Sequence, residues 1–312
     1  TGVISEIKAD GMFFNGNIEP GISNLTSRQG QPFPSEPFEA LAEQLQSMFK
    51  IIGMVTRFED GMQVHGELLV VNEQGETLPR EIGNGMLNKV NSGNELPPGH
   101  KITAMIWDVI PLTSAVKKGS YNAAYLHRLK AITGALGVLK ATRTDMLIEV
   151  IETRVVRSYE EAMEHYMDAR RRKLEGTIVK KPTMMWKDGT SKEQVKLKQE
   201  VPFELEVYGF EEGKEGGKTE ETFGSLKCRT SDDLLRVNVG TALSDDLRKE
   251  INDNREDWLG AIITIKGNEI MYAKRGKLVH SIFLPVFIER RYDKTVADTF
   301  QQVVDQFEAA VK

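Results

Sequence analysis

The stretch Lys-Ala-Asp-Gly at residues 8–11 places an amine, a carboxylate and a glycine next to one another. The residues before it alternate between apolar and polar, which predicts a strand that enters a turn at Gly11. An amine in such a position can act as a nucleophile when it is held in its neutral form. Lys8 is therefore a candidate for covalent catalysis, and Asp10 shares its face of the strand.

Short strings elsewhere in the chain carry further charged and aromatic side chains. In chain order they are SRQG with Arg28, HGEL with Glu67, IWDVIPL with Trp107, EGTIVK with Glu175, VKLK with Lys196 and Lys198, and RRYDK with Arg291 and Lys294. The two lysines of VKLK are two residues apart, so they project from one face of a strand. Each string alone has an ordinary explanation, such as a surface acid or a core aromatic. Their occurrence together in this order is improbable by chance and indicates a common function.

Hydrophobic periodicity in the first two thirds of the chain predicts a mixture of helices and strands. Helices are predicted at 36–50, at 120–137 with an end near Gly137, and from Ser158, with a capping box to Glu161, to the basic cluster before Gly176. Strands are predicted at 65–71, 102–110, 175–181 and 193–199. This alternation indicates an α+β domain that ends near residue 198.

After Lys198 the pattern changes to short strands separated by polar turns. They are predicted at 203–210, 224–230, 234–240, 260–270 and 278–287, with one helix at 244–251 among them. Strands at these short intervals are typical of a small closed barrel. A last helix, capped by Thr295, is predicted to place Val296, Phe300 and Phe307 on one side.

Composition narrows the class of protein. The 312 residues are 40% hydrophobic and 28% charged, as in a globular protein, and the single cysteine, Cys228, cannot form an internal disulfide. The five histidines lack metal-ligand spacing, and no apolar run approaches the ~20 residues of a membrane span, so we expect a soluble cytoplasmic protein without a structural metal. The net charge of −5 disfavours a general nucleic-acid binder, but the basic residues between Arg170 and Lys198 form a tract that can bind phosphates.

The motifs in this order resemble the covalent nucleotidyltransferases, and within them the ATP-dependent DNA ligases of the T-even bacteriophage type. The strings IWDVIPL and IFLPVFIERRYDKTVADTF are especially similar, and the resemblance covers nearly the whole chain. It implies a nucleotidyltransferase (adenylation) domain over residues 1–198, followed by an OB-fold β-barrel with a C-terminal helix over residues 199–312. Ligases of this type carry a helical DNA-binding domain before the catalytic lysine, so we expect this chain to be a catalytic core without that amino-terminal domain.

The resemblance implies a reaction in three steps. Lys8 attacks the α-phosphate of ATP and becomes Lys8-AMP, the AMP passes to the 5′-phosphate at a nick in duplex DNA, and the 3′-OH then displaces it. Nearby cations such as Lys196 and Lys198 would favour the neutral amine and balance the charge of the attacked phosphate. Asp10 is a candidate for the later, DNA-directed steps.

The resemblance also assigns groups that bind ATP, Mg²⁺ and DNA. Trp107 offers a flat face to adenine, Glu6 accepts a hydrogen bond from the adenine amino group, and Ile7 lines the same pocket. Glu175 supplies a hard oxygen for Mg²⁺, and Glu67 holds the ribose or a second metal ion. Arg28 binds the 5′-phosphate of the nick, while Arg291 and Lys294 reach the departing pyrophosphate when the barrel closes. The enzyme would act as a monomer in the cytoplasm of the phage's bacterial host.

Two positions depart from the family pattern. The motif usually continues K-x-D-G-x-R, and Phe13 stands at the arginine position; His65 stands where an aspartate usually precedes Gly66. An RNA ligase and an mRNA-capping guanylyltransferase remain as enzymatic alternatives, since both use a lysine nucleophile. A non-catalytic nick-binding module is a third alternative, although such a module has no need of Lys8.

Overall fold

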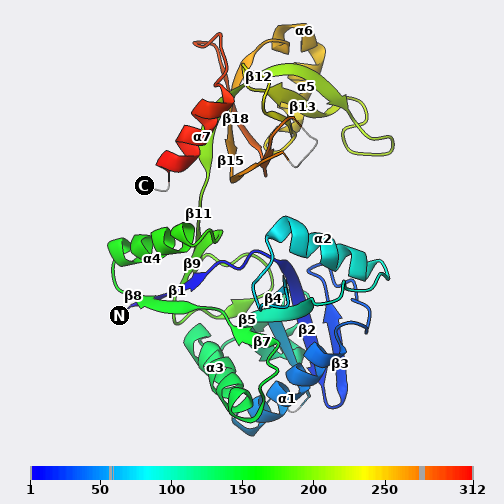
Figure 1. The fold of residues 1–312 in the computed structure, drawn as a ribbon, viewed down its shortest axis with the longest axis vertical. Helices are drawn as coiled ribbons and strands as arrows, with labels where there is room; N and C mark the ends of the chain where they lie inside the picture. Colours follow the sequence, from blue (N-terminus) through cyan, green and yellow to red (C-terminus); the bar gives the residue numbers. More distant parts are fainter. Residues whose placement is uncertain (1, 56–57, 59, 274–277, 311–312) are drawn as a thin grey trace. The chain divides into compact units, whose positions relative to one another are not determined.

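The computed structural model describes residues 2–55, 58, 60–273 and 278–310, and the chain divides into two compact units, Thr1–Leu197 and Lys198–Lys312 (Figure 1). Each unit has a hydrophobic core of its own. None of the helices formed by these residues has both the length and the apolar character that a bilayer span requires.

Two sheets form the framework of the first unit. The larger has the order β3-β2-β4-β5-β7 and consists of β2 (Met12–Glu19), β3 (Ile22–Thr26), β4 (Met62–Val71), β5 (Lys101–Pro111) and β7 (Ile148–Val150). The smaller has the order β11-β9-β1-β8 and consists of β1 (Val3–Ile7), β8 (Thr153–Val156), β9 (Gly176–Lys180) and β11 (Gln194–Lys198). A two-stranded pair joins β6 (Ser120–Tyr121) to β10 (Trp186–Lys187). The predicted strands around Glu67, Trp107 and Lys196 are confirmed.

Four helices cover these sheets, and a 3₁₀ turn at Leu112–Ser114 follows β5. They are α1 (Glu39–Val55), α2 (Arg80–Asn91), α3 (Tyr125–Thr142) and α4 (Tyr159–Arg171). α1 and α3 lie side by side on the larger sheet, where their apolar faces join the main core, and α2 packs on β4 (Figure 1). α4 packs on the smaller sheet, and the predicted Ser158 cap is confirmed because its hydroxyl accepts the Glu161 N–H at 3.2 Å. The Glu161 carboxylate accepts the Arg157 N–H at 2.8 Å and not that of Ser158, so the predicted capping box is only half formed.

Several helices and strands differ from the sequence prediction. β1 ends at Ile7, so Lys8 to Gly11 form the connection into β2 rather than a continuation of the strand. α3 begins at Tyr125 and continues through Gly137, since its buried residues extend to Leu139. α2 was not predicted, because its glycines and asparagines are poor helix formers, although Gly83, Leu87 and Val90 form a buried stripe.

The second unit is built on a five-stranded antiparallel sheet with the order β14-β13-β12-β15-β18. Its strands are β12 (Val201–Glu212), β13 (Phe223–Arg229), β14 (Arg236–Val239), β15 (Ile262–Gly267) and β18 (Val286–Arg291), and β16 (Glu269–Met271) pairs with β17 (Ser281–Phe283). The predicted helix at 244–251 is confirmed as α5 (Asp245–Asp253), followed by the short α6 (Arg255–Trp258). An isolated bridge joins Thr241, after β14, to Val286 of β18. The ladder between the described strands is open, so the predicted closed barrel is not confirmed.

The predicted cap of the last helix was wrong. α7 (Phe300–Ala309) is capped by Thr299, which exchanges hydrogen bonds with Gln302 in a capping box. Thr295 cannot start the helix because Asp298, three residues later, is paired with β12: its N–H donates to the Glu204 carbonyl and its carboxylate accepts the Glu204 N–H. Phe307 is buried by α7 as predicted, but Val296 lies before the helix and is exposed.

Candidate active site

Lys8 lies at the end of β1, beside the first residues of β9. Its backbone N–H donates to the Gly176 carbonyl at 2.9 Å, and its ammonium forms an ion pair with the Glu175 carboxylate. The two side chains are only 20% and 16% exposed, so the pair sits in a partly desolvated position. An ammonium nitrogen has no free electron pair, so Lys8 must give up a proton before its nitrogen can act as a nucleophile.

The turn after Lys8 is held by β4 and α2. A side chain on Gly11 would bring a Cβ within 2.2 Å of the Leu68 carbonyl oxygen, so this close approach requires glycine. The Gly11 N–H donates to the Glu67 carboxylate at 3.3 Å, and the Asn84 side chain donates to the Gly11 carbonyl at 3.0 Å. Arg80, the first residue of α2, pairs with Asp10 at 2.9 Å.

Two carboxyl groups beside Lys8 are more difficult to ionise than usual. Burial raises the pKa of Glu67 to about 7, although the Gly11 hydrogen bond and the charges of Lys8 and Arg28 act in the opposite direction. Burial also raises the pKa of Asp10, and the charge of Arg80 opposes that shift. Lys8, Asp10, Glu67 and Glu175 thus form one electrostatically coupled group.

The raised pKa of Glu67 predicts a pH-dependent cost to stability. Unfolded Glu67 ionises near 4.5 and folded Glu67 near 7, so stability that is present below pH 4.5 is lost as the pH rises through 7. Glu67→Gln cannot ionise and escapes this loss. We expect its free energy of unfolding, relative to the unmodified protein, to increase by about 2–3 kcal/mol between pH 4.5 and 8.

Urea unfolding at pH 4.5 and 8, without nucleotide, measures this difference. Glu149→Gln changes an exposed glutamate on β7 and serves as the control. The same pH dependence in Glu67→Gln and in the unmodified protein would contradict the prediction.

A second group of polar side chains surrounds Glu6 in the interior of the first unit. Glu6 is 1% exposed, and its carboxylate pairs with Lys180 at 2.5 Å and accepts a hydrogen bond from the Tyr125 hydroxyl. Burial raises the pKa of Glu6, with the Lys180 charge opposing the shift. The same tyrosine contacts the Trp107 carbonyl at 2.9 Å, so the backbone of Trp107 is tied to Glu6.

An aromatic pair occupies the position where the family pattern has an arginine. The Phe13 ring packs against the half-buried Trp107 with 5.9 Å between centroids, and the Arg28 guanidinium lies 4.8 Å from the centre of the Phe13 ring. A guanidinium over an aromatic face is a favourable cation–π contact. The other departing residue, His65, is buried and stacks on Trp186, and burial lowers its pKa.

The remaining predicted residues have other surroundings. Ile7 is buried, and its backbone N–H bonds to Glu152. Lys196 is exposed on β11. Lys198 is the last residue of β11 and the first residue of the second unit, and it pairs with Glu200 at 2.9 Å. Farther along the second unit, Arg291 pairs with Glu204 and Asp293 at 2.6 Å each, and Lys294 pairs with Glu204 at 3.0 Å.

Sequence reasoning missed four residues that surround the site: Arg80, Tyr125, Arg128 and Lys180. Lys180 had a partial signal, because strand alternation places it on the same face of β9 as Ile178. These two residues are the cross-strand partners of Ile4 and Glu6 of β1, so all four lie on one face of the sheet. Arg128, three residues after Tyr125 on α3, binds Asp108 through two hydrogen bonds of 2.6 and 3.0 Å. Nothing in the sequence near these helical residues marks them as part of a site.

The carboxylates beside Lys8 offer oxygens of the kind that Mg²⁺ binds. Within the described part of the chain, no three His, Cys, Asp or Glu side chains gather closely enough to hold a metal by themselves. Mg²⁺ commonly binds one or two carboxylates together with substrate phosphates and waters. Glu175 and Glu67 provide such oxygens without a third carboxylate.

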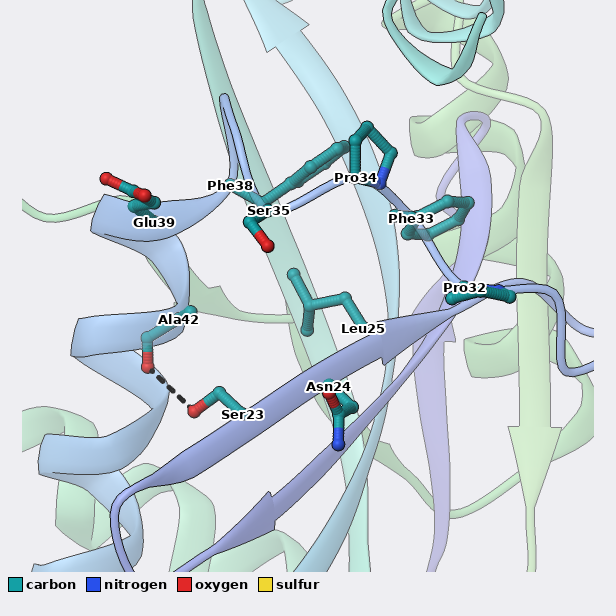
Figure 2. A pocket seen from close by; sticks show the side chains of 10 residues that line it. All are labelled: Ser23, Asn24, Leu25, Pro32, Phe33, Pro34, Ser35, Phe38, Glu39 and Ala42. Atoms are coloured by element: carbon teal, nitrogen blue, oxygen red, sulfur yellow. Dashed lines mark hydrogen bonds between the residues drawn. The ribbon is translucent and has the colours of Figure 1, made fainter. Parts of the chain in front are cut away.

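Two concave regions of the first unit lie outside this group of residues. Figure 2 shows a pocket of about 260 Å³ between β3, residues 32–35 and the start of α1, where the Ser23 hydroxyl donates to the Ala42 carbonyl at 3.5 Å. A larger cavity of about 1030 Å³ extends from Pro34 to Glu149 along the ends of β4 and β5. Neither contains Lys8 or Glu175, so the chemistry of the side chains, and not the size of a cavity, identifies the candidate site.

Comparisons with known proteins point to one family. A family model described as "ATP dependent DNA ligase domain" matches residues 1–198. The DNA ligases of Enterobacteria phages T4 and T6 are each 25% identical over 240 residues, which cover 73% of this chain and 47% of theirs. The chain therefore spans about half the length of these relatives.

Solved structures show the same fold. The structure named "Pmar-Lig_Pre." matches with a TM-score of 0.71 at 19% identity, covering 94% of this chain and 64% of the other. The ATP-dependent DNA ligase of bacteriophage T7, in complex with ATP, matches with a TM-score of 0.51 at 20% identity, covering 93% of this chain and 92% of the other. Since the family model covers more than half of the residues, the chain belongs to the ATP-dependent DNA ligase family.

Proposed function

We propose that the chain catalyses the ATP-dependent sealing of nicks in duplex DNA through a covalent lysyl-AMP. The observation that carries this proposal is Lys8, held by Glu175 at the glycine turn, within the residues that match the ligase family. The phage relatives, both named DNA ligases, support it. We also propose that the chain acts as a monomer in the cytoplasm of a bacterial host.

The proposed reaction begins at the Lys8 amine. A bond forms between its neutral nitrogen and the α-phosphorus of ATP, and the bond from that phosphorus to the bridging oxygen breaks. Pyrophosphate leaves with the electron pair, and the nitrogen releases a proton. The AMP then moves to the 5′-phosphate oxygen of the nick, which frees Lys8. The 3′-OH attacks this activated phosphate, loses its proton, and expels AMP.

The surrounding residues have distinct roles in this proposal. Asp10, released from Arg80, acts in the DNA-directed steps, and Arg28 binds the 5′-phosphate of the nick. Glu175 and Glu67 hold Mg²⁺, which on binding neutralises phosphate charge, and Glu67 also contacts the ribose. Lys196 and Lys198 place positive charge near the phosphates. Trp107 and Ile7 line the base pocket.

Selectivity for ATP follows from the buried pair of Glu6 and Lys180. A carboxylate has about four acceptor positions and an ammonium three donors, so each retains capacity after their mutual contact and those with Tyr125. Glu6 can accept from the 6-amino group of adenine, and Lys180 can donate to the ring nitrogen N1. Guanine has a carbonyl and an N–H at these two places, so both contacts are mismatched.

We therefore expect GTP to label the protein about 10- to 100-fold less efficiently than ATP, since an unmatched buried polar contact costs on the order of 1–3 kcal/mol. The measurement compares rates of covalent labelling by α-labelled ATP and GTP. Equal rates would remove the base-reading role of Glu6 and favour a capping-type enzyme.

The second unit is proposed to be an OB-fold whose Arg291 and Lys294 orient the pyrophosphate. The five-stranded sheet and the Thr241–Val286 bridge between its edges support that assignment. Both cations share the carboxylate of Glu204, which is 13% exposed, so they are held together at one place on the sheet.

Replacing both cations by alanine is expected to lower self-adenylylation about a hundredfold, because charge on the leaving group is no longer stabilised. Joining of a nick that already carries AMP should change much less. Arg236→Ala, which removes an exposed arginine paired with Asp233 in the same unit, is the control. An equal fall in both assays would assign the pair to DNA binding.

The overall proposal is tested by incubating the protein with α-labelled ATP and Mg²⁺, and then with nicked duplex DNA. We expect a labelled protein band that disappears when the nick is added and a joined strand that appears with it. Labelling without joining of DNA, but with joining of RNA ends, would favour the RNA ligase. Absence of labelling would favour the non-catalytic module.

A further inference from the structure

The Tyr125 hydroxyl is the point where the base-reading pair meets the base-stacking residue. Tyr125 is the first residue of α3 and is fully buried. Its hydroxyl contacts the Glu6 carboxylate, the Lys180 ammonium at 3.0 Å and the Trp107 carbonyl at 2.9 Å. Three different strands, β1, β5 and β9, are therefore joined through one oxygen atom.

The position of this oxygen is fixed from several directions. The Tyr125 backbone N–H donates to the Met184 carbonyl at 2.9 Å, and Arg128, one turn further along α3, donates to the same carbonyl at 3.1 Å. The Lys180 ammonium lies 4.3 Å from the centre of the Tyr125 ring, and the Arg128 guanidinium lies 5.4 Å from it. A ring held in this way cannot turn its hydroxyl away from Glu6.

The phenol has one hydrogen but faces two acceptors, the Glu6 carboxylate and the Trp107 carbonyl. Burial raises its pKa well above the usual value, and the Glu6 charge adds to the shift, so the phenol remains a donor at physiological pH. A carboxylate has about four acceptor positions, so Glu6 can accept a hydrogen from a further donor while the phenol continues to donate to it. The carboxylate can thus accept a new donor without leaving the phenol buried and unsatisfied.

We propose that Tyr125 is a positioning residue for base selection, which holds the Glu6 carboxylate in the orientation that accepts the 6-amino group of adenine. This inference rests on the proposed function, since it requires ATP to be the substrate. It goes further in assigning part of the base selectivity to a residue outside the ligase motifs. Tyr125 touches neither the reacting phosphate nor Lys8 in this role, so it acts through Glu6.

The test compares ATP with purine riboside triphosphate, which lacks the 6-amino group, in covalent labelling of the unmodified protein and of Tyr125→Phe. In the unmodified protein the missing amino group should raise KM, with little change in kcat. Tyr125→Phe keeps the ring and removes only the hydroxyl. We expect it to raise KM for ATP about tenfold, as the loss of a hydrogen bond to a charged group predicts, and to leave KM for the analogue almost unchanged.

If Tyr125 had a purely structural role, Tyr125→Phe would change KM for ATP and KM for the analogue by the same factor. That result would overturn the inference. Tyr166→Phe, a change at a buried tyrosine on α4, is the matched control and should leave the ratio of the two KM values unchanged. Tyr125→Met also removes the hydroxyl and keeps an apolar side chain, and it replaces Tyr125→Phe in the comparison if thermal unfolding shows that the phenylalanine variant does not fold. If the unmodified protein is not labelled by ATP, the proposed function fails first, and that outcome is seen before any variant is compared.

Discussion

Lys8→Ala is expected to abolish covalent labelling of the protein by α-labelled ATP. The covalent step requires a nitrogen that can bond to the α-phosphorus, and Lys8 is the amine that the structure places beside Glu175 at the end of β1. Asp10 and Glu67, which share its electrostatic environment, are carboxylates and cannot form the same phosphoramide bond. Without this side chain the covalent lysyl-AMP therefore cannot form at all.

The same variant should remain folded and should still join a nick that already carries AMP. The Glu175 carboxylate left behind is 16% exposed, so water can solvate part of its charge. Lys181→Ala, which removes a largely exposed lysine next to β9, is the control and should be labelled normally. A labelled adduct that survives in Lys8→Ala would place the nucleophile elsewhere and contradict the proposed mechanism.

The parts of the site that could be predicted are those whose chemistry lies within one short string. The glycine turn after Lys8, Glu67 on β4 and Trp107 on β5 follow from strand alternation and local turn residues. Gly11 shows why such strings are informative, because its close approach to the Leu68 carbonyl excludes every side chain. Local geometry of this kind is determined by consecutive residues, and it can therefore be predicted from the sequence.

The parts that could not be predicted depend on contacts between distant residues. The role of Glu6 changes once Lys180 and Tyr125 are seen beside it, because these partners come from 174 and 119 positions further along the chain. α2 was missed since its own residues disfavour a helix, and it forms because its stripe of Gly83, Leu87 and Val90 packs against β4. The cap at Thr299 was misplaced for a similar reason, since pairing of Asp298 with β12 excludes an earlier start.

The second large effect that we expect is a loss of stability when Arg128 is replaced. Its guanidinium binds both oxygens of Asp108 and also donates to the carbonyls of Ala123 and Met184, with side-chain exposures of 2% for the arginine and 7% for Asp108. Arg128→Met leaves a buried carboxylate without its counter-charge and two carbonyls without this donor. Breaking such a buried pair costs about 3–5 kcal/mol, which we expect as the loss in free energy of unfolding of the first unit.

The matched control lies at the other end of the same helix. Arg143 binds Asp145 with the same two-point geometry, at 3.0 Å for each contact, but Asp145 is 66% exposed. Arg143→Met should therefore cost no more than about 1 kcal/mol, because water screens and replaces an exposed pair. Urea unfolding of both variants separates the effect of burial from the effect of hydrogen-bond geometry.

A double variant shows whether the uncompensated charge is the cause of the loss. Asp108 also accepts the Val109 N–H at 2.9 Å, and asparagine can keep that contact through its carbonyl oxygen while carrying no charge. Arg128→Met combined with Asp108→Asn should therefore be more stable than Arg128→Met alone, because the buried carboxylate is no longer present. The single variant Asp108→Asn completes the comparison. If the loss of stability in the double variant equals the sum of the losses in Arg128→Met and Asp108→Asn, the charge of Asp108 has little part in the effect. The arginine then stabilises the first unit through its packing and its contacts with Ala123 and Met184.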